Sequence, residues 1–184
     1  MPLQKTSKEE IIKKAVDVFR KNGYYKTSMA NLADACGLLK GSFYYYFKSK
    51  EELMHAALQF TCEYYSNKVF CIAYDTSLDA RERFITLFNK QAPFLTDDLA
   101  GCLFGNMTLE TISANSSFQF ILQKFFSEWK KAFTTIFELE HDKETSNVLA
   151  EQSVMELEGA LMMMRLYNDK KIFEDACKRV LEKL

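Results

Sequence analysis

Basic and hydroxyl-bearing side chains are concentrated in one short stretch of this sequence, between residues 40 and 50. The candidates for chemistry in it are Lys40, Ser42, Tyr44, Tyr45, Tyr46 and Lys50, with Gly41 between the first two. Ammonium and hydroxyl groups donate hydrogen bonds to phosphate oxygens, and the free backbone N–H groups at a helix start also attract anions. The stretch therefore predicts phosphate binding. Three consecutive tyrosines, taken alone, are equally consistent with packing at the edge of a core.

Two short helices with a tight turn between them are predicted to position these side chains. The first is capped by Thr27 or Ser28 and ends at Cys36, and Gly37 lets the chain turn sharply. The second covers residues 40–47. A hydrophobic corner would hold the pair together, formed by Leu32, Ala33, Leu38, Phe43 and Phe47. This arrangement is typical of a helix-turn-helix, with the polar side chains on its outer face.

The rest of the chain also favours helices. A capping box, Ser7 to Glu10, begins a helix that ends at Gly23, and a second, Ser49 to Glu52, begins a long helix to about Tyr74. Further helices are predicted near residues 78–95, 99–112, 116–139, 145–167 and 171–183. Only 6 Gly and 2 Pro interrupt 184 residues, and no segment alternates with the period of a strand. The predicted fold class is all-α, with about nine helices.

The formal charge of −1 hides an uneven distribution. Residues 1–56 contain ten Lys and Arg against six Asp and Glu, whereas residues 57–184 contain fourteen against nineteen. A basic module attached to a larger acidic one fits phosphate binding at one end of the chain. Chance variation in surface charge is the alternative interpretation.

Several functional classes find no support in the sequence. No apolar run approaches the roughly 20 residues of a membrane span, and the first ten residues are too polar for a secretory signal, so we expect a cytoplasmic protein without membrane contact. Five scattered cysteines and two histidines, His55 and His141, predict no metal site. Neither a nucleophile–base pair nor a glycine-rich phosphate loop is present, so we expect no cofactor and no enzymatic activity.

Residues 27–53 carry a family resemblance. Their sequence, TSMANLADACGLLKGSFYYYFKSKEEL, closely resembles the DNA-binding signature of the tetracycline-repressor (TetR) family. The similarity extends over roughly residues 7–55 without a gap. It implies a three-helix helix-turn-helix domain over residues 1–50 and a helical ligand-binding and dimerisation domain over residues 51–184. The implied function is a transcriptional regulator of double-stranded DNA.

The resemblance also implies a role for each residue of the module. Lys40, Gly41 and Ser42 would begin the recognition helix in the major groove, and Tyr44 would face bases or sugar-phosphate. Phosphate contacts would come from Thr27, Ser28, Tyr45, Tyr46 and Lys50. Two positions depart from the family pattern: Ala30 stands where Arg is common, and Tyr46 where His is common. Direct reading of guanine should therefore be modest.

In the family the second domain encloses an apolar pocket for an effector. Residues 57–184 are rich in aromatic side chains, most of which must form ordinary core. As a hypothesis, five of these aromatic side chains and one methionine line a pocket for a flat hydrophobic ligand: Phe60, Tyr64, Phe104, Met107, Phe125 and Trp129. The effector itself cannot be identified from the sequence.

An alternative switch is the thiol of Cys102, within the Gly101-Cys102-Leu103-Phe104-Gly105-Asn106 segment. A thiol at a helix N-terminus can have a lowered pKa and react with electrophiles as a thiolate. Buried and inert cysteine is the commoner case.

The last two predicted helices have the pattern of a subunit interface. The first is apolar on two faces, so it must pack against two neighbours, one of which can be another subunit. In the family, two such helices from each subunit form a four-helix interface, with candidate residues Met155, Gly159, Met162, Leu166, Phe173 and Val180. Burial within a monomer is the alternative.

A homodimer would bind an inverted-repeat operator, and ligand binding would release it through the long helix that begins at Ser49. Repression is expected, although activation stays open.

Overall fold

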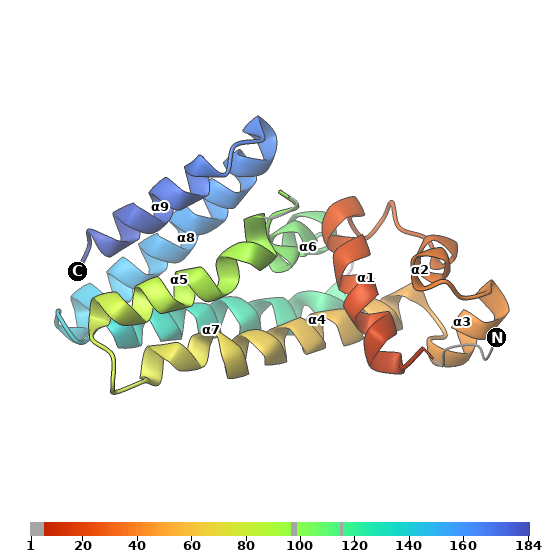
Figure 1. Cartoon of the computed structure of the whole chain (residues 1–184), viewed down its shortest axis with the longest axis horizontal. Helices are drawn as coiled ribbons and strands as arrows, with labels where there is room; N and C mark the ends of the chain where they lie inside the picture. The colour runs from red at the N-terminus through yellow and green to blue at the C-terminus, as the bar shows by residue number, and fades with distance from the viewer. Residues whose placement is uncertain (1–5, 97–98, 115) are drawn as a thin grey trace.

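The computed structural model describes residues 6–96, 99–114 and 116–184, and this part of the chain is all-helical, as expected. Its helices are α1 Lys8–Asn22, α2 Met29–Cys36, α3 Lys40–Tyr46, α4 Lys50–Lys68, η1 Phe70–Tyr74, α5 Ala80–Thr96, α6 Leu103–Thr111, η2 Ser116–Phe118, α7 Gln119–Phe137, α8 Lys143–Tyr167 and α9 Lys171–Leu181, where η marks a 3-10 helix. In Figure 1, α1 to α3 gather at one end and the C-terminus lies near the other, with α4 and α7 running between. None of the described helices is long and apolar enough to cross a membrane.

Local sequence explains the three N-terminal helices. The Ser7 hydroxyl accepts a hydrogen bond from the Glu10 amide (3.1 Å), and the Glu10 carboxylate accepts one from the Ser7 amide (2.8 Å). Gly37 closes α2 in the left-handed conformation, with φ of 69°. Leu32, Phe43 and Phe47 are fully buried between the helices. The module is the predicted helix-turn-helix.

The long fourth helix is shorter than predicted. Instead of continuing to Tyr74, α4 ends at Lys68, and residues 70–74 form the 3-10 helix η1. The tighter turn buries Phe70, whose ring centroid lies 5.6 Å from that of Phe125. Arg83 of α5 donates a hydrogen bond to the carbonyl of Ala73 (2.8 Å), which satisfies a backbone group that the α-helix leaves open. Tertiary contacts therefore outweigh the local preference for a continuous helix.

Helix α6 begins later than predicted, at Leu103 rather than near residue 99. Leu99 and Gly101 both have positive φ (55° and 75°), a conformation that a right-handed helix excludes. The backbone between them turns before Cys102 caps the helix.

Aromatic side chains fill the core of the larger domain. Phe104 and Phe125 stack face to face, with centroids 3.6 Å apart and planes 2° from parallel. A second cluster joins Phe84 of α5 to Phe133 and Phe137 of α7, at centroid distances of 4.9 and 5.0 Å. These contacts pack α5 and α6 against α7.

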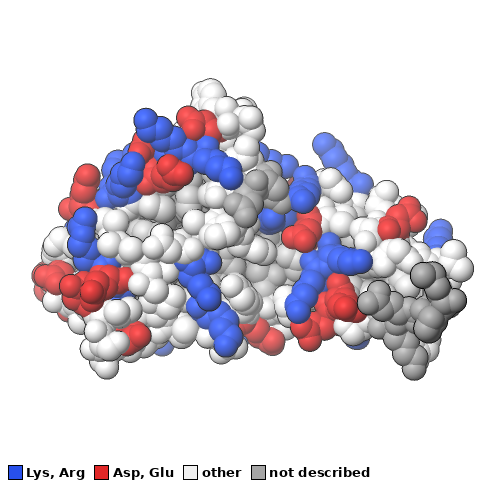
Figure 2. Space-filling model, in the orientation of Figure 1, with Lys and Arg blue, Asp and Glu red and all other residues white. Residues whose placement is uncertain are grey.

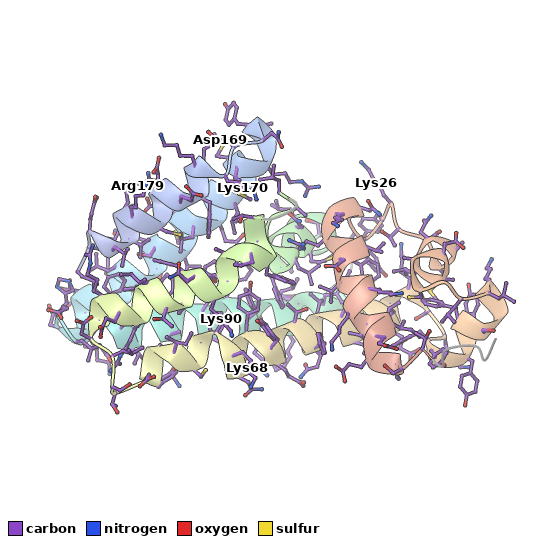
Figure 3. The ribbon with its side chains drawn as sticks, in the orientation of Figure 1. Lys26, Lys68, Lys90, Asp169, Lys170 and Arg179 are labelled. Atoms are coloured by element: carbon purple, nitrogen blue, oxygen red, sulfur yellow. The ribbon has the colours of Figure 1, made fainter. Side chains whose placement is uncertain are left out.

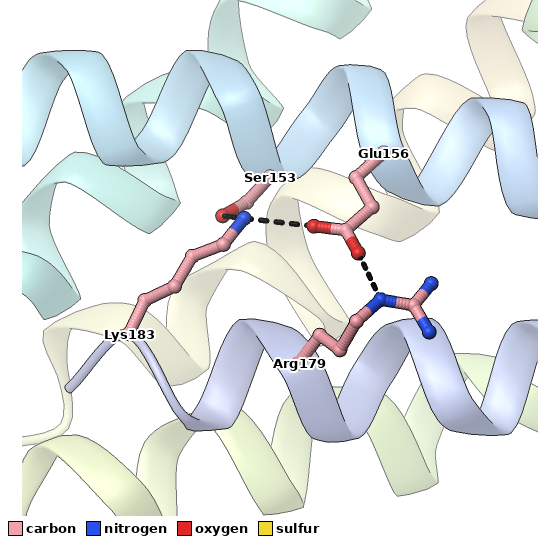
Figure 4. A network of polar contacts seen from close by, with 4 residues as sticks. All are labelled: Ser153, Glu156, Arg179 and Lys183. Carbon is pink, nitrogen blue, oxygen red and sulfur yellow. Dashed lines mark hydrogen bonds and ion pairs between the residues drawn. The ribbon is translucent and has the colours of Figure 1, made fainter.

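A polar network joins the two C-terminal helices (Figure 4). The Glu156 carboxylate of α8 accepts hydrogen bonds from Arg179 of α9 (2.5 Å) and from Lys183 (2.8 Å), and Lys183 also donates to Ser153 (3.2 Å). Although partial burial opposes ionisation, these partners hold the pKa of Glu156 below its usual value. The network fixes the register of α8 against α9.

Candidate nucleic-acid interface and adjoining cavity

The outer face of α3 presents most of the side chains predicted to contact nucleic acid. Lys40, Gly41 and Ser42 are exposed, as are Tyr44 (37%) and Tyr45 (79%). A Cβ atom added at Gly41 would meet nothing within 4 Å, so the backbone there is open to close approach. This face combines one ammonium group, three hydroxyls and an accessible backbone.

The two residues at the start of α2 differ in accessibility. Thr27 is buried, and its hydroxyl donates a hydrogen bond to the carbonyl of Gly23 (2.6 Å). Ser28 is exposed and caps α2, because its hydroxyl accepts a hydrogen bond from the Asn31 amide (3.1 Å). Of the pair, only Ser28 has a side chain that faces solvent.

Tyr46 and Lys50 make contacts inside the protein. The half-buried Tyr46 hydroxyl donates to the carbonyl of Thr6 (3.0 Å). The Lys50 ammonium donates to the carbonyl of Tyr24 (2.8 Å) and lies 4.2 Å from the centroid of the Tyr24 ring. Burial lowers the pKa of Lys50, while the negative charge of Glu110 acts in the opposite direction. Both residues therefore stabilise the module in this structure.

The basic charge of the N-terminal segment does not form a concentrated patch on the face seen in Figure 2. Lys and Arg side chains there are interspersed with Asp and Glu along the molecule. Lys26 extends from the loop after α1 into solvent (Figure 3).

A carboxylate of α6 holds the loop that connects α1 to α2. Glu110 accepts hydrogen bonds from the backbone amides of Tyr24 (2.8 Å) and Tyr25 (3.3 Å). The approach is possible because the neighbouring residue is glycine: a Cβ at Gly23 would lie 2.2 Å from the Glu110 carboxylate. With Lys50 binding the Tyr24 carbonyl, the loop is held from α6 and from α4 at once.

Further polar contacts tie the end of α1 to the larger domain. The buried Arg20 donates to the carbonyl of Phe94 in α5, and its guanidinium lies 4.8 Å from the Phe94 ring centroid. Asn106 of α6 donates to the carbonyl of Arg20 (3.3 Å), and Arg165 of α8 donates to that of Lys21 (3.3 Å). No local sequence pattern predicts the role of these residues or of Glu110, because single polar residues on helices carry no motif.

Replacing Glu110 by Gln should weaken the contact between α6 and the loop that connects α1 to α2. We expect Glu110→Gln to lower the free energy of unfolding by about 1–2 kcal/mol, because a charged acceptor of two backbone amides is lost. Hydrogen exchange of the Tyr24 and Tyr25 amides should become faster. The matched control is Glu138→Gln, an exposed carboxylate at the end of α7, which should change neither quantity. Unchanged exchange at Tyr24 and Tyr25 would contradict the assigned role of Glu110.

An open cavity of about 470 Å³ lies between α6 and α8, beside the module. Its walls include Cys102, Gly105 and Asn106 of the α6 region, Phe126 of α7, and Glu158, Gly159, Met162 and Arg165 of α8. Cavities of roughly 300–1,000 Å³ hold small organic molecules.

The six residues predicted to line one pocket are not brought together around it. Phe60 and Tyr64 border a separate groove of about 340 Å³ between α1 and α4. The remaining four are buried in the core, namely Phe104, Met107, Phe125 and Trp129. Close packing of the rings of Phe104 and Phe125 leaves no space between them for a ligand. The sequence pattern identified aromatic core residues but could not distinguish them from cavity walls.

Cys102 does not have the surroundings of a reactive thiol. Its side chain is buried, and its sulfur accepts a hydrogen bond from the Gly105 amide (3.5 Å). Burial, reinforced by the Glu158 carboxylate, raises the pKa of the Cys102 thiol well above its usual value. Since the thiolate is the reactive form, the structure does not favour Cys102 as an electrophile sensor. Among the described residues, no three His, Cys, Asp or Glu side chains converge to hold a metal ion.

One side of α8 is apolar and exposed in the single chain. Met155 (64%), Met162 (57%) and Leu166 (69%) face solvent, and Gly159 lies between them on the same side. Phe173 and Val180 of α9 are instead buried within the chain, contrary to their expected place in a subunit interface. The apolar stripe of α9 packs against α8 and α5, which removes these two side chains from the surface.

Comparison with known proteins identifies the chain. Residues 11–57 match the family described as bacterial regulatory proteins, tetR family, and residues 79–179 match the C-terminal domain of LmrA/YxaF-like transcriptional regulators. The chain belongs to the tetR family. It is therefore a DNA-binding helix-turn-helix transcriptional regulator rather than an enzyme.

Relatives and solved structures agree with this tetR-family membership. The transcriptional repressor DhaR of Mycobacterium sp. (strain GP1) is 26% identical over 188 residues, covering 96% of this chain and 91% of DhaR. The uncharacterised regulator YerO of Bacillus subtilis (strain 168) is 47% identical over 58 residues, or 32% of this chain and 19% of YerO. A TetR transcriptional regulator from Legionella pneumophila superposes with a TM-score of 0.88 over the whole of both chains, at 26% identity.

Proposed function

We propose that this tetR-family regulator is a homodimeric repressor that binds an inverted-repeat operator and releases it when a small effector binds. In this proposal, residues 1–50 bind DNA, and residues 51–184 dimerise and bind the effector. The observation that carries it is the outer face of α3, where Lys40, Ser42, Tyr44 and Tyr45 lie exposed on a rigidly attached helix-turn-helix. Relatives named as repressors support the direction of regulation.

The exposed stripe of α8 supports the dimer. Exposed apolar side chains lie along one side at Val148, Met155, Met162 and Leu166, with Gln152 and Gly159 between them. A contiguous apolar surface of this kind marks an interaction site. A two-fold dimer built through it would present two α3 helices to successive major grooves, about 34–36 Å apart.

Helix α6 supports the coupling between effector and operator. Its N-terminal end borders the cavity through Cys102 and Gly105, and its C-terminal end holds the α1–α2 loop through Glu110. The sequence suggested α4 as the lever, but no residue of α4 lines this cavity. A shift of α6 on effector binding would therefore move the loop and change the spacing of the two α3 helices.

Enrichment of genomic fragments bound by the purified protein, at two salt concentrations, tests the proposal. Recovery of one inverted-repeat motif, with binding that weakens steeply as salt rises, is the expected result. Lys40→Ala should weaken binding to that motif by about 10-fold. The matched control is Lys68→Ala, an exposed lysine at the end of α4 (Figure 3), which should bind like the parent. Failure to enrich any motif at low salt would overturn operator binding.

A further inference from the structure

Glu158 is a half-buried acidic group that no described basic side chain neutralises. It lies on α8 in the wall of the cavity, opposite the first turn of α6. Its Oε1 atom is buried and has no hydrogen-bond partner among the described residues. On the other side, the carboxyl group forms a hydrogen bond with the Cys102 thiol. A buried acceptor without a donor is costly and needs an explanation.

Glycine at position 105 makes room for this carboxyl group. A Cβ at Gly105 would lie 2.3 Å from the Glu158 Oε2 atom, so any larger residue would force the side chain to move. The acid is thus inserted into a space that the first turn of α6 leaves open. Its surroundings in the cavity are otherwise mainly apolar, with Phe126, Leu161 and Met162 in the walls.

The basic groups nearby are engaged elsewhere. Arg165, on the rim, donates to the carbonyls of Ala100 (3.5 Å) and Lys21 (3.3 Å). Lys130 of α7, in a neighbouring groove that Glu158 also borders, pairs with Glu151. The cavity therefore offers an acidic acceptor on an apolar wall.

We propose that the cavity binds an amphiphilic cation, with its ammonium group against Glu158 and its apolar body along Phe126 and Leu161. The inference rests on the proposed effector-responsive function and names the chemical class of the effector. An ammonium group supplies both the missing hydrogen-bond donor and the missing positive charge. An apolar chain fits the remaining wall, and the volume of about 470 Å³ suits a molecule of modest size.

Direct titration with three probes of equal chain length tests this ligand class without DNA. The probes are decylammonium, 1-decanol and decanoate, used below their micelle-forming concentrations. The readout is the fluorescence of Trp129, the only tryptophan, whose ring lies 6.3 Å from that of the cavity residue Phe126. Decylammonium should bind at least about 10-fold more tightly than decanol, and decanoate should bind most weakly.

Two isosteric variants separate a specific site from general attraction to an acidic protein. Glu158→Gln should remove the preference for decylammonium over decanol while keeping the thermal melting temperature. Glu151→Gln, an exposed carboxylate on the same helix, should keep the preference. No response to any probe, tightest binding of decanoate, or an equal preference in Glu158→Gln would each overturn the proposal. Operator binding by the ligand-free protein is measured in a separate experiment. If the protein binds no operator, that result counts against the proposed function and not against the cation site.

The pH dependence of decylammonium binding gives a second readout. Burial raises the pKa of Glu158 from 4.5 to about 7, against the opposing effect of the hydrogen bond with Cys102. The pKa values of the nearby Cys102 thiol and Tyr65 hydroxyl lie well above their usual ranges, so neither group titrates near neutrality. The affinity should rise from pH 6 to pH 8 as Glu158 ionises, by up to about 10-fold. In Glu158→Gln the affinity should be independent of pH, and a persistent rise would contradict the assignment.

Discussion

The double variant Met155→Glu with Leu166→Glu, on the outer side of α8, should be a folded monomer. Its affinity for the operator should be lower than the parent's by about 100-fold or more. Both side chains are exposed in the single chain (64% and 69%), so the substitutions disturb no internal packing. In a dimer they would bring like charges together in an apolar contact. Each monomer would then bind one half-site of the operator independently. The gain in affinity that comes from linking two weak protein–DNA contacts would be lost.

Mass from analytical ultracentrifugation and operator binding are the paired measurements. The matched control is Ile85→Glu with Leu139→Glu, two exposed aliphatic positions on α5 and after α7 (39% and 49%). This control should stay dimeric and bind the operator normally. A Met155/Leu166 variant that remains dimeric would place the subunit interface on another surface.

Removal of the Phe125 ring should have the largest effect on stability. The ring is buried and lies against Phe104 (3.6 Å between centroids), Tyr65 (5.3 Å) and Phe70 (5.6 Å). Phe125→Ala would leave a cavity that these rigid neighbours cannot fill, so we expect a loss of about 3–5 kcal/mol in unfolding free energy. The midpoint of thermal unfolding should fall by roughly 10 °C.

Phe120→Ala provides the comparison on the same helix, because Phe120 is 79% exposed. Its effect should stay within about 0.5 kcal/mol. Both variants are compared with the parent at one protein concentration, since dissociation of a dimer contributes to apparent stability. Equal losses of unfolding free energy in Phe125→Ala and Phe120→Ala would mean that the aromatic stack is not a main contributor to the stability of the core.

Local sequence signals predicted the secondary structure and the helix-turn-helix well. Capping at Ser7 and the glycine turn at Gly37 depend on residues a few positions apart, so they can be read without tertiary information. The same holds for the apolar periodicity of the helices. Where the boundaries were wrong, at the end of α4 and the start of α6, contacts from distant segments or positive φ angles changed the local preference.

The sequence by itself therefore determined the all-α class, the helix-turn-helix and the family resemblance. It could not decide which side chains converge in space. Glu110 contacts the Tyr24 amide across 86 residues of chain, and Glu158 meets Cys102 across a shorter but still long separation in sequence. Likewise, periodicity alone could not separate the exposed Met155 from the buried Phe173, because both lie on apolar helix stripes. Only the packing of whole helices decides which apolar stripe is covered and which polar group is buried without a partner.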